Sequence, residues 1–196
     1  MSEWSLNTYD KFDDQIKRVW RNLEIECHHY VFQCYDWLFH WQQTIGNDRS
    51  IQPVIVTVSH HGRVVALFPM ALRRALGARI IEFLGGDQSD YNAPLIINSY
   101  MTETRMQDIW GHVQDVLPIH DIKLMLRIPQ LIIKKENFLC SLWKARRVTS
   151  SYALILPNSV EELNTLIPKK IDQIVNVKQI VSLNKEICQL SLLQQI

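Results

Sequence analysis

The pattern of hydrophobic and polar positions changes from a helical to an extended period near residue 50. In residues 7–23, apolar side chains recur at steps of three and four, which predicts one face of a helix. That face consists of Phe12, Ile16, Val19, Trp20 and Leu23. A second helix is predicted over residues 30–43, with an inner side formed by Val31, Cys34, Tyr35, Leu38 and Trp41. The polar, glycine-containing stretch "TIGNDRS" ends it.

Runs of β-branched residues then take over. "PVIVTVS" and "RVVALFPMALRR" are joined by "HHG", which predicts a hairpin with Gly62 at a positive φ. "ARIIEFLG" is a third predicted strand after a turn at Leu76-Gly77, and "APLII" is a short fourth. Thr102 is the predicted N-cap of a helix over 103–117, which Pro118 closes. "IKLMLRI" predicts a fifth strand, buried on both faces because its apolar run is nearly continuous.

The pattern is less regular after residue 130. It predicts a short helix from Glu136 to Leu142, a strand through "SSYALILP" and a helix start with a capping box from Ser159 to Glu162. From residue 168 on, the sequence predicts an amphipathic helix. The order of elements indicates a mixed α/β fold. Its central sheet is partly antiparallel with flanking helices, and an isolated C-terminal helix follows.

Composition narrows the class of protein. With 47% hydrophobic residues, 21% charged residues and a net charge of +1, electrostatics favour neither nucleic acid nor an anionic membrane as a partner. No apolar run approaches the length of a membrane span, and the N-terminus lacks the basic and apolar regions of a signal peptide. The four cysteines show no paired short spacing, which favours free thiols in a reducing cytoplasm.

Several segments together resemble a known family. They are the tryptophan-rich start with Trp4, Trp20, Trp37 and Trp41, the strand pair ending in "PMALRR", the segment "FLGGDQSDYNAPLI" and the later "LPNSVEELNTLIPKK". Over most of residues 4–185 the chain resembles the CelD-like cellulose-biosynthesis proteins of the GNAT acyltransferase superfamily. Those proteins are similar in build to the Fem-type aminoacyl transferases, which have two GNAT-like halves in tandem.

The resemblance implies transfer of an acyl group from a thioester carrier, usually acyl-CoA, to an amine acceptor. It also implies an acyl-CoA site in the second half. Lys169 and Lys170 match the opening of that half, whereas "ICQLSLLQQI" departs from it. The chain is therefore expected to contain a first GNAT-like half over 1–157 and the helical start of a truncated second half over 158–196. We expect this chain alone to be inactive as an enzyme.

The partner expected from the resemblance is a small-molecule or cell-envelope-precursor amine acceptor. A second prediction concerns the apolar positions of the C-terminal helix, which would remain exposed without a sheet to cover them. This exposure predicts self-association. The positions are Ile171, Ile174, Val175, Ile180, Val181, Ile187 and Leu190.

No cofactor-binding residues are predicted. A phosphate-binding loop of the GNAT type would follow the pattern Gln/Arg-x-x-Gly-x-Gly/Ala and lead into a helix, where free amides and the helix dipole attract anions. The nearest match, "RALGAR", ends in arginine and precedes a strand-like run. A hairpin turn is therefore the favoured interpretation.

Residues 81–97, "IEFLGGDQSDYNAPLII", present three alternatives. Pro94 argues against a phosphate loop because it excludes the helix that would have to follow. A structural turn would let Asp87 or Asp90 bond to its own backbone. In the third interpretation, Asp90 and Tyr91 project into the cleft between the two halves and contact the acceptor. A carboxylate there could orient or deprotonate an amine, and a tyrosine could protonate a leaving thiolate.

The histidine pair His60-His61 is predicted to face solvent in its turn. Adjacent residues of a strand point to opposite faces, and no acidic or cysteine partner is suitably spaced to complete a metal site. No metal ligand or catalytic residue is assigned. Because the phosphate loop is missing, a non-catalytic binding or scaffold module with the same fold is the alternative function.

Overall fold

The computed structural model describes residues 3–129, 131–132, 135–146 and 159. The chain divides into two compact units, residues 1–146 and 147–196. All the helices and strands described below belong to the first unit.

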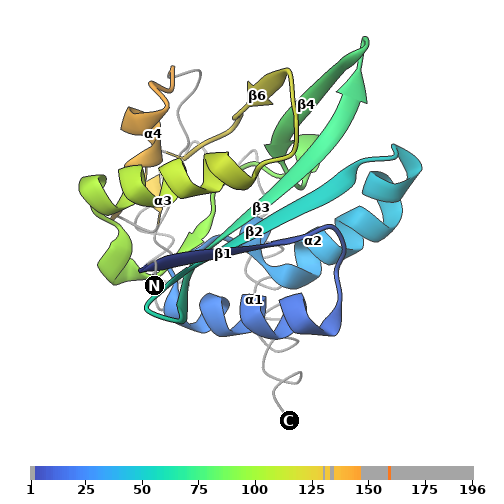
Figure 1. Cartoon of the computed structure of the whole chain (residues 1–196). Coiled ribbons are helices and arrows are strands. Elements are labelled where there is room, and N and C mark those ends of the chain that lie inside the picture. Colours follow the sequence, from blue (N-terminus) through green and yellow to red (C-terminus); the bar gives the residue numbers. More distant parts are fainter. Residues whose placement is uncertain (1–2, 130, 133–134, 147–158, 160–196) are drawn as a thin grey trace, which may run out of the picture. The chain divides into compact units, whose positions relative to one another are not determined.

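The first unit interleaves helices and strands along the chain (Figure 1). The α-helices are α1 (Asp14–Glu26), α2 (Tyr35–Trp41), α3 (Glu103–Val116) and α4 (Leu139–Leu142). The strands are β1 (Trp4–Tyr9), β2 (Gln52–His60), β3 (Arg63–Ala75), β4 (Ala78–Phe83), β5 (Leu95–Ile96), β6 (Ile122–Leu124), β7 (Leu131–Ile132) and β8 (Lys135–Glu136). The single-turn elements are η1 (Val31–Gln33), the π-helix η2 (Gln42–Gly46), η3 (Gly86–Gln88) and η4 (Asn98–Tyr100).

The main sheet has six strands in the order β1-β2-β3-β4-β6, with β5 also paired to β3. All pairs are antiparallel except β4 and β6, which are parallel and are connected through α3. The predicted mixed α/β fold with a partly antiparallel sheet and flanking helices is thereby confirmed. Both β4 and β5 lie along β3, so the chain leaves the sheet after β4 and returns to the same strand at β5.

Two tight hairpins organise the antiparallel part. The β2–β3 turn has positive φ at His61 and Gly62, and the β3–β4 turn has positive φ at Leu76 and Gly77. Two consecutive left-handed residues match the twist of the flanking strands. The predicted hairpin with Gly62 is confirmed, and "RALGAR" is the second hairpin rather than a phosphate loop.

Helices cover both faces of the sheet (Figure 1). On one face, α1 and α2 pack on β2 and β3 through Ile16, Trp20 and Leu38, each at most 1% exposed. On the other face, α3 and α4 pack through Ile109, Val113 and Leu139, each fully buried. Burial of such side chains is the main favourable contribution to folding. Trp20 and Trp41 lie in the first core, as the helical pattern predicted.

The first predicted helix begins later than expected. Residues 4–9 form edge strand β1, paired with β2 from Trp4↔His60 to Tyr9↔Ile55. The helix starts at Asp14, where the Asp13 carboxylate caps it by accepting from the Ile16 N–H at 3.0 Å. Burial alternates only weakly along β1, because an edge strand pairs with a single neighbour and several of its side chains reach solvent. In the second helix, Val31 is 57% exposed and does not belong to the inner side, because it lies in η1 before α2 begins.

The predicted fifth strand is also shorter and more exposed than expected. Strand β6 contains only Ile122–Leu124, with β4 as its partner at the edge of the sheet. Ile122 is 46% exposed and Leu126 is 55% exposed, so burial on both faces was wrong. The short helix begins at Leu139 rather than Glu136, because Lys135–Glu136 pairs with β7.

Other predictions fall mainly or wholly outside the described residues. These are the strand through "SSYALILP", the capping box after Ser159, the C-terminal helix and its self-association.

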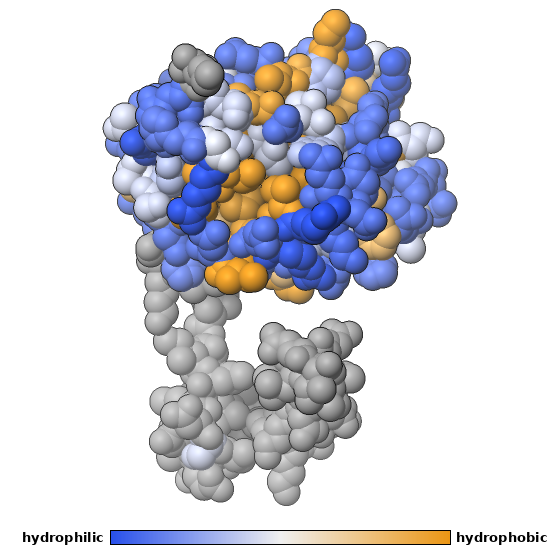
Figure 2. All heavy atoms as spheres, turned by 60° about the horizontal axis from the view of Figure 1, so that its bottom comes forward, coloured by the Kyte–Doolittle hydropathy of each residue, from blue (hydrophilic) through white to orange (hydrophobic). Residues whose placement is uncertain are grey.

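No described helix has the length and apolar character needed to cross a membrane. Figure 2 shows a face that is largely hydrophilic, with apolar side chains gathered in its central area. Exposed large apolar residues of the first unit include Ile25, Val31 and Leu131.

Candidate functional site

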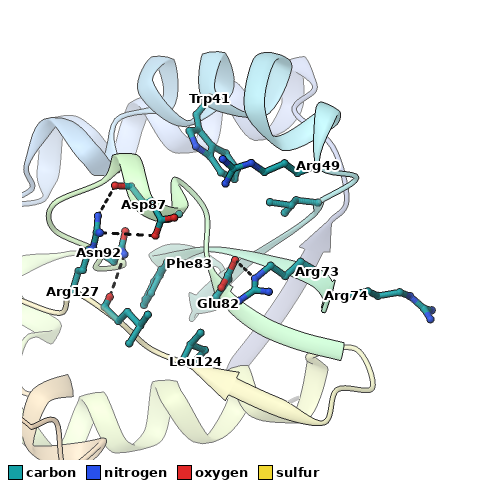
Figure 3. A pocket seen from close by; sticks show the side chains of 13 residues that line it. Trp41, Arg49, Arg73, Arg74, Glu82, Phe83, Asp87, Asn92, Leu124 and Arg127 are labelled. Atoms are coloured by element: carbon teal, nitrogen blue, oxygen red, sulfur yellow. Dashed lines mark hydrogen bonds and ion pairs between the residues drawn. The ribbon is translucent and has the colours of Figure 1, made fainter. Parts of the chain in front are cut away.

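A pocket of about 430 Å³ lies where β4 and β6 end and the chain leaves the sheet. Figure 3 shows its walls: Trp41 and Arg49 on one side, Arg73 and Glu82 on the sheet, and Asp87, Asn92 and Arg127 opposite. The carboxyl ends of adjacent parallel strands are a common location for ligand sites in α/β folds. We call this site the arginine pocket, after Arg49, Arg73, Arg74 and Arg127.

One wall of the arginine pocket is the loop 84–92, and two glycines make its path possible. Gly85 has φ +96° and Gly86 has φ +49°, in the left-handed region that glycine adopts without a steric penalty. A Cβ atom on Gly85 would lie 2.0 Å from the Ser89 hydroxyl oxygen. The pair "GG" therefore turns the chain away from β4 and lets the loop fold back on itself.

Hydrogen bonds from three directions hold this loop. From α2, the indole N–H groups of Trp37 and Trp41 donate to Ser89 Oγ at 3.1 Å and to Gln88 Oε1 at 3.0 Å. The buried Gln33 amide donates to the Tyr91 carbonyl at 2.6 Å.

Beyond β6, Arg127 donates to the carbonyl oxygens of Asp87 and Ser89 at 2.5 and 3.2 Å. In return, Asn92 donates to the carbonyls of Arg127 and Leu126 at 2.9 and 3.1 Å. The loop is fixed to both sides of the pocket, which gives it a preorganised wall.

The pocket lining contains two more positive than negative side chains. Arg73 is neutralised by Glu82, with 2.8 Å between Nε and Oε1, and Arg127 lies 3.9 Å from the Asp87 carboxylate. Among the described residues, no carboxylate lies within ion-pair distance of Arg49 or Arg74. The guanidinium of Arg74 extends away from the cavity (Figure 3). The available positive charge inside the pocket therefore comes from Arg49 and partly from Arg127.

This arrangement suits a small ligand that carries both signs of charge. A guanidinium group binds carboxylate or phosphate oxygens through several N–H donors in one plane. The carboxylates of Glu82 and Asp87 can accept hydrogen bonds from an ammonium or amine group. Trp41, Phe83 and Leu124 supply apolar contact surface between these groups. The pocket can thus hold an amine whose other end is anionic.

The two residues predicted to contact the acceptor lie beside this pocket rather than in its lining. Asp90 is exposed to solvent. The Tyr91 ring packs on Tyr30 at a centroid distance of 4.9 Å and on Phe32 at 6.0 Å. The same segment contributes Phe83, Gly86, Asp87 and Asn92 to the pocket lining. Residues 81–97 therefore contribute to the pocket lining through side chains other than the two that the sequence singled out.

Sequence reasoning missed the arginines. The ion pair between Arg73 and Glu82 could have been found, because the two-residue turn at Leu76-Gly77 places them diagonally across β3 and β4. Arg49 and Arg127 come from irregular segments that no periodicity connects. Their approach depends on how α2 and the segment after β6 pack on the sheet.

The second polar feature is the histidine cluster, which we define as Glu3, His60, His61 and Tyr100. The prediction that His60 faces solvent was wrong, because its side chain is only 6% exposed. His60 Nε2 lies 2.5 Å from Glu3 Oε1, and its Nδ1 lies 2.7 Å from the Tyr100 hydroxyl. His61 Nε2 lies 3.1 Å from the same Glu3 oxygen.

Glu3 was not foreseen as a partner because it is 57 residues distant from His60 and lies next to it only through the β1–β2 pairing. The hydrogen bond from His60 lowers the pKa of the Glu3 carboxyl below its ordinary value. Glu3 therefore remains an anion where the two imidazoles meet.

The described cysteines are free thiols, as their spacing predicted. Burial raises the pKa of Cys27 to about 12 and that of Cys34 to about 11. A thiol with such a pKa is a poor nucleophile at neutral pH. These two cysteines are structural and lie outside the pocket lining.

Comparison with protein-family models, with curated proteins and with solved structures gave no match. The function is therefore inferred from the residues and their geometry, and the resemblance to GNAT acyltransferases stays a prediction.

Proposed function

We propose that this chain is the acceptor-binding half of a GNAT-type N-acyltransferase, and that the arginine pocket holds the amine acceptor. The observation that supports this proposal most directly is the pocket itself. It is a preformed cavity at the ends of parallel strands, and its lining contains four arginines and two carboxylates. The partly antiparallel sheet with helices on both faces fits the architecture that the resemblance implies.

The proposed acceptor is a small amine that also carries a carboxylate or phosphate group. Its anionic end would contact Arg49 and Arg127, and its amine would contact Glu82 or Asp87. These contacts would orient the amine nitrogen and keep its anionic end away from the reacting end. Positioning of this kind lowers the entropic part of a reaction barrier.

The described residues do not fit an acyl-CoA site. The nearest phosphate-loop sequence is a hairpin turn, and the loop after β4 uses its backbone and side chains for contacts within the protein. We expect acyl-CoA to bind this chain weakly or not at all. The proposed role of the described residues is to bind and orient the acceptor.

Calorimetry on the full chain tests this proposal with a matched pair of ligands. Phosphoethanolamine and ethanolamine differ only in the phosphate group. We expect phosphoethanolamine to bind at least about tenfold more tightly, because one charged hydrogen bond contributes about 1.5 to 3 kcal/mol. Equal affinities would contradict an arginine-based site. Micromolar binding of acetyl-CoA would contradict the assignment of this half to the acceptor.

Arg49→Gln is the matching variant, because Arg49 is exposed and makes no described ion pair. We expect it to reduce the affinity for phosphoethanolamine about tenfold without changing the unfolding temperature. Lys11→Gln is the control, since it removes the same charge from an exposed residue outside the pocket lining. A similar loss of affinity in both variants would indicate a general charge effect instead of a pocket contact.

A non-catalytic binding module is the second candidate, favoured by the absence of a phosphate loop among the described residues. Both candidates use the arginine pocket, so binding data do not separate them. The coding sequence downstream of this chain separates them. Further strands and a Gln/Arg-x-x-Gly-x-Gly/Ala loop encoded there would favour the acyltransferase half, whereas retained amine binding without such a downstream sequence would favour the module.

A further inference from the structure

We infer that the histidine cluster is a site for a divalent transition-metal ion, with Zn²⁺ as the expected occupant. Three ligand atoms converge there: Nε2 of His60, Nε2 of His61 and a carboxylate oxygen of Glu3. All three lie within 4.8 Å of one another. Two imidazoles with one carboxylate are a donor set that zinc uses in proteins.

The backbone brings these side chains together. Glu3 directly precedes β1, and its carbonyl accepts the His61 N–H at 3.0 Å, which extends the β1–β2 ladder into the turn. Side chains of adjacent residues in a strand diverge, but His61 has φ +50°. This left-handed conformation turns its ring back, so that the two imidazole centroids lie 4.2 Å apart. The turn therefore overrides the alternation from which the sequence predicted separate faces.

A tetrahedral ion fits among these atoms once the two exposed side chains rotate. Zinc bonds of about 2.0 to 2.2 Å place neighbouring ligand atoms roughly 3.3 to 3.5 Å apart. Here the Glu3 oxygen lies 2.5 Å from one imidazole nitrogen and 3.1 Å from the other. Rotation of the exposed Glu3 and His61 side chains would open these separations, while the backbone stays in place.

The surroundings orient the buried ligand. His60 Nδ1 lies 2.7 Å from the Tyr100 hydroxyl, and the Trp4 ring packs on the imidazole at a centroid distance of 4.3 Å. With Nε2 on a metal, Nδ1 carries the hydrogen and donates it to the Tyr100 oxygen. Outer contacts of this kind fix the ring and the tautomer of a ligating histidine. Tyr100 is thus a positioning residue for the site.

The opposite side of the cluster is open. The side chains of His61 and Glu3 are 71% and 53% exposed, which leaves space for a water molecule as fourth ligand. One feature opposes cation binding: the Arg105 guanidinium lies 5.9 Å from the Trp4 ring and 5.6 Å from the Tyr100 ring. Its positive charge should weaken metal affinity without blocking the ligands.

Cobalt(II) titration of the full chain, followed by zinc displacement, tests this site. Co²⁺ reports tetrahedral coordination by visible absorption, and thiolate ligation would add a near-ultraviolet band. We expect one equivalent of Co²⁺ with no thiolate band, displaced by Zn²⁺. Failure to bind, or a thiolate band, would overturn the proposal because the metal would then be absent or on a cysteine.

Variants assign the ligands. His61→Asn retains a residue type that tolerates positive φ, so the turn is preserved while a good ligand is lost. We expect His61→Asn and Glu3→Gln each to lower Co²⁺ affinity at least tenfold, with unchanged circular dichroism. His40→Gln removes an exposed histidine elsewhere and should leave the affinity unchanged. Retention of wild-type affinity in both His61→Asn and Glu3→Gln would overturn the assignment.

Two further variants act through the surroundings. Tyr100→Phe should lower Co²⁺ affinity about tenfold, as loss of an outer hydrogen bond to a ligating histidine typically does. Arg105→Gln should raise the affinity about two- to threefold at low salt, because it removes a repelling charge. An affinity unchanged in both would contradict the described geometry of the site.

Discussion

The arginine pocket and the histidine cluster lie at opposite ends of the β2–β3 hairpin, and they are built in different ways. The pocket collects charged side chains from four segments around a cavity, and part of its charge is unpaired. The cluster packs its polar atoms against one another at a tight turn. The pocket offers volume for an organic ligand, whereas the cluster offers three potential ligand atoms within 4.8 Å of one another.

The glycine-containing turns of the two regions differ in how much space surrounds the glycine. Gly62 lies in the turn of the cluster, where a Cβ atom would meet nothing within 4 Å. Gly85 lies in the wall of the pocket, where a Cβ atom would meet Ser89 and Leu38 at 2.0 and 3.2 Å. Gly62 is therefore needed only for its positive φ, whereas Gly85 is needed both for its positive φ and because a side chain there would clash with its neighbours.

The largest expected effect comes from Gly85→Ala. A positive φ costs an alanine about 1 to 2 kcal/mol, and the clash with the buried Ser89 adds to it. We expect a loss of about 3 kcal/mol in the free energy of unfolding, measured with urea, and loss of ligand binding in the pocket. Gly62→Ala is the control and should cost only about 1 kcal/mol. Equal losses in the two variants would show that crowding at Gly85 is unimportant.

The next effect sharpens the role of the cluster in stability. Tyr100→Phe removes the hydroxyl group at Nδ1 of the buried His60, and an unsatisfied buried polar atom costs about 1 to 3 kcal/mol. We expect a loss of about 1.5 kcal/mol in the metal-free protein, measured by urea unfolding. The control is Tyr91→Phe, because the Tyr91 hydroxyl has no hydrogen bond among the described residues. It should change stability by less than about 0.5 kcal/mol.

A pH-dependent effect concerns the β4–β6 edge that bounds the pocket. Arg79 bonds both carboxylate oxygens of Asp121, at 3.0 Å from Nη2 to Oδ1 and 3.1 Å from Nε to Oδ2. These bonds lower the pKa of Asp121 from 3.8 to about 2. The folded-state pKa is depressed, so the stabilisation is present above the unfolded pKa and disappears as pH falls through the folded value.

Asp121→Asn should therefore be less stable than the wild type near neutral pH, and the difference should shrink between about pH 4 and pH 2. The measurement is urea unfolding at a series of pH values. Because both groups are partly exposed, the effect should also decrease at high salt. A difference independent of pH over that window would contradict the ion pair as its source.

The cysteines bear least on the comparison, because Cys27 and Cys34 belong neither to the pocket lining nor to the histidine cluster. At pH 8, Cys27 and Cys34 should react with iodoacetamide far more slowly in the native chain than in urea. Their pKa values of about 12 and about 11 leave almost no thiolate. Peptide mapping by mass spectrometry reads each cysteine separately. Labelling of Cys27 as fast in the folded chain as in the unfolded one would contradict its burial.

The sequence by itself determined the elements whose signals are local. The hairpins at Gly62 and Gly77, the cap at Thr102 and the helical faces around Trp20 and Trp41 follow from turn chemistry and periodicity. It also identified residues 81–97 as the segment of interest and excluded a phosphate loop there. Edge strand β1 escaped prediction because it has too few buried positions to produce a strong pattern, and edge strand β6 was predicted too long and too buried.

Only the tertiary structure decided which side chains meet. Arg49 and Arg127 reach one cavity because α2 and the segment after β6 pack around the loop 84–92, and no spacing along the chain encodes that approach. Glu3 reaches His60 through strand pairing, and His61 joins them through a left-handed turn residue. Both sites depend on contacts between residues far apart in sequence, which arise only when the sheet and its helices are packed.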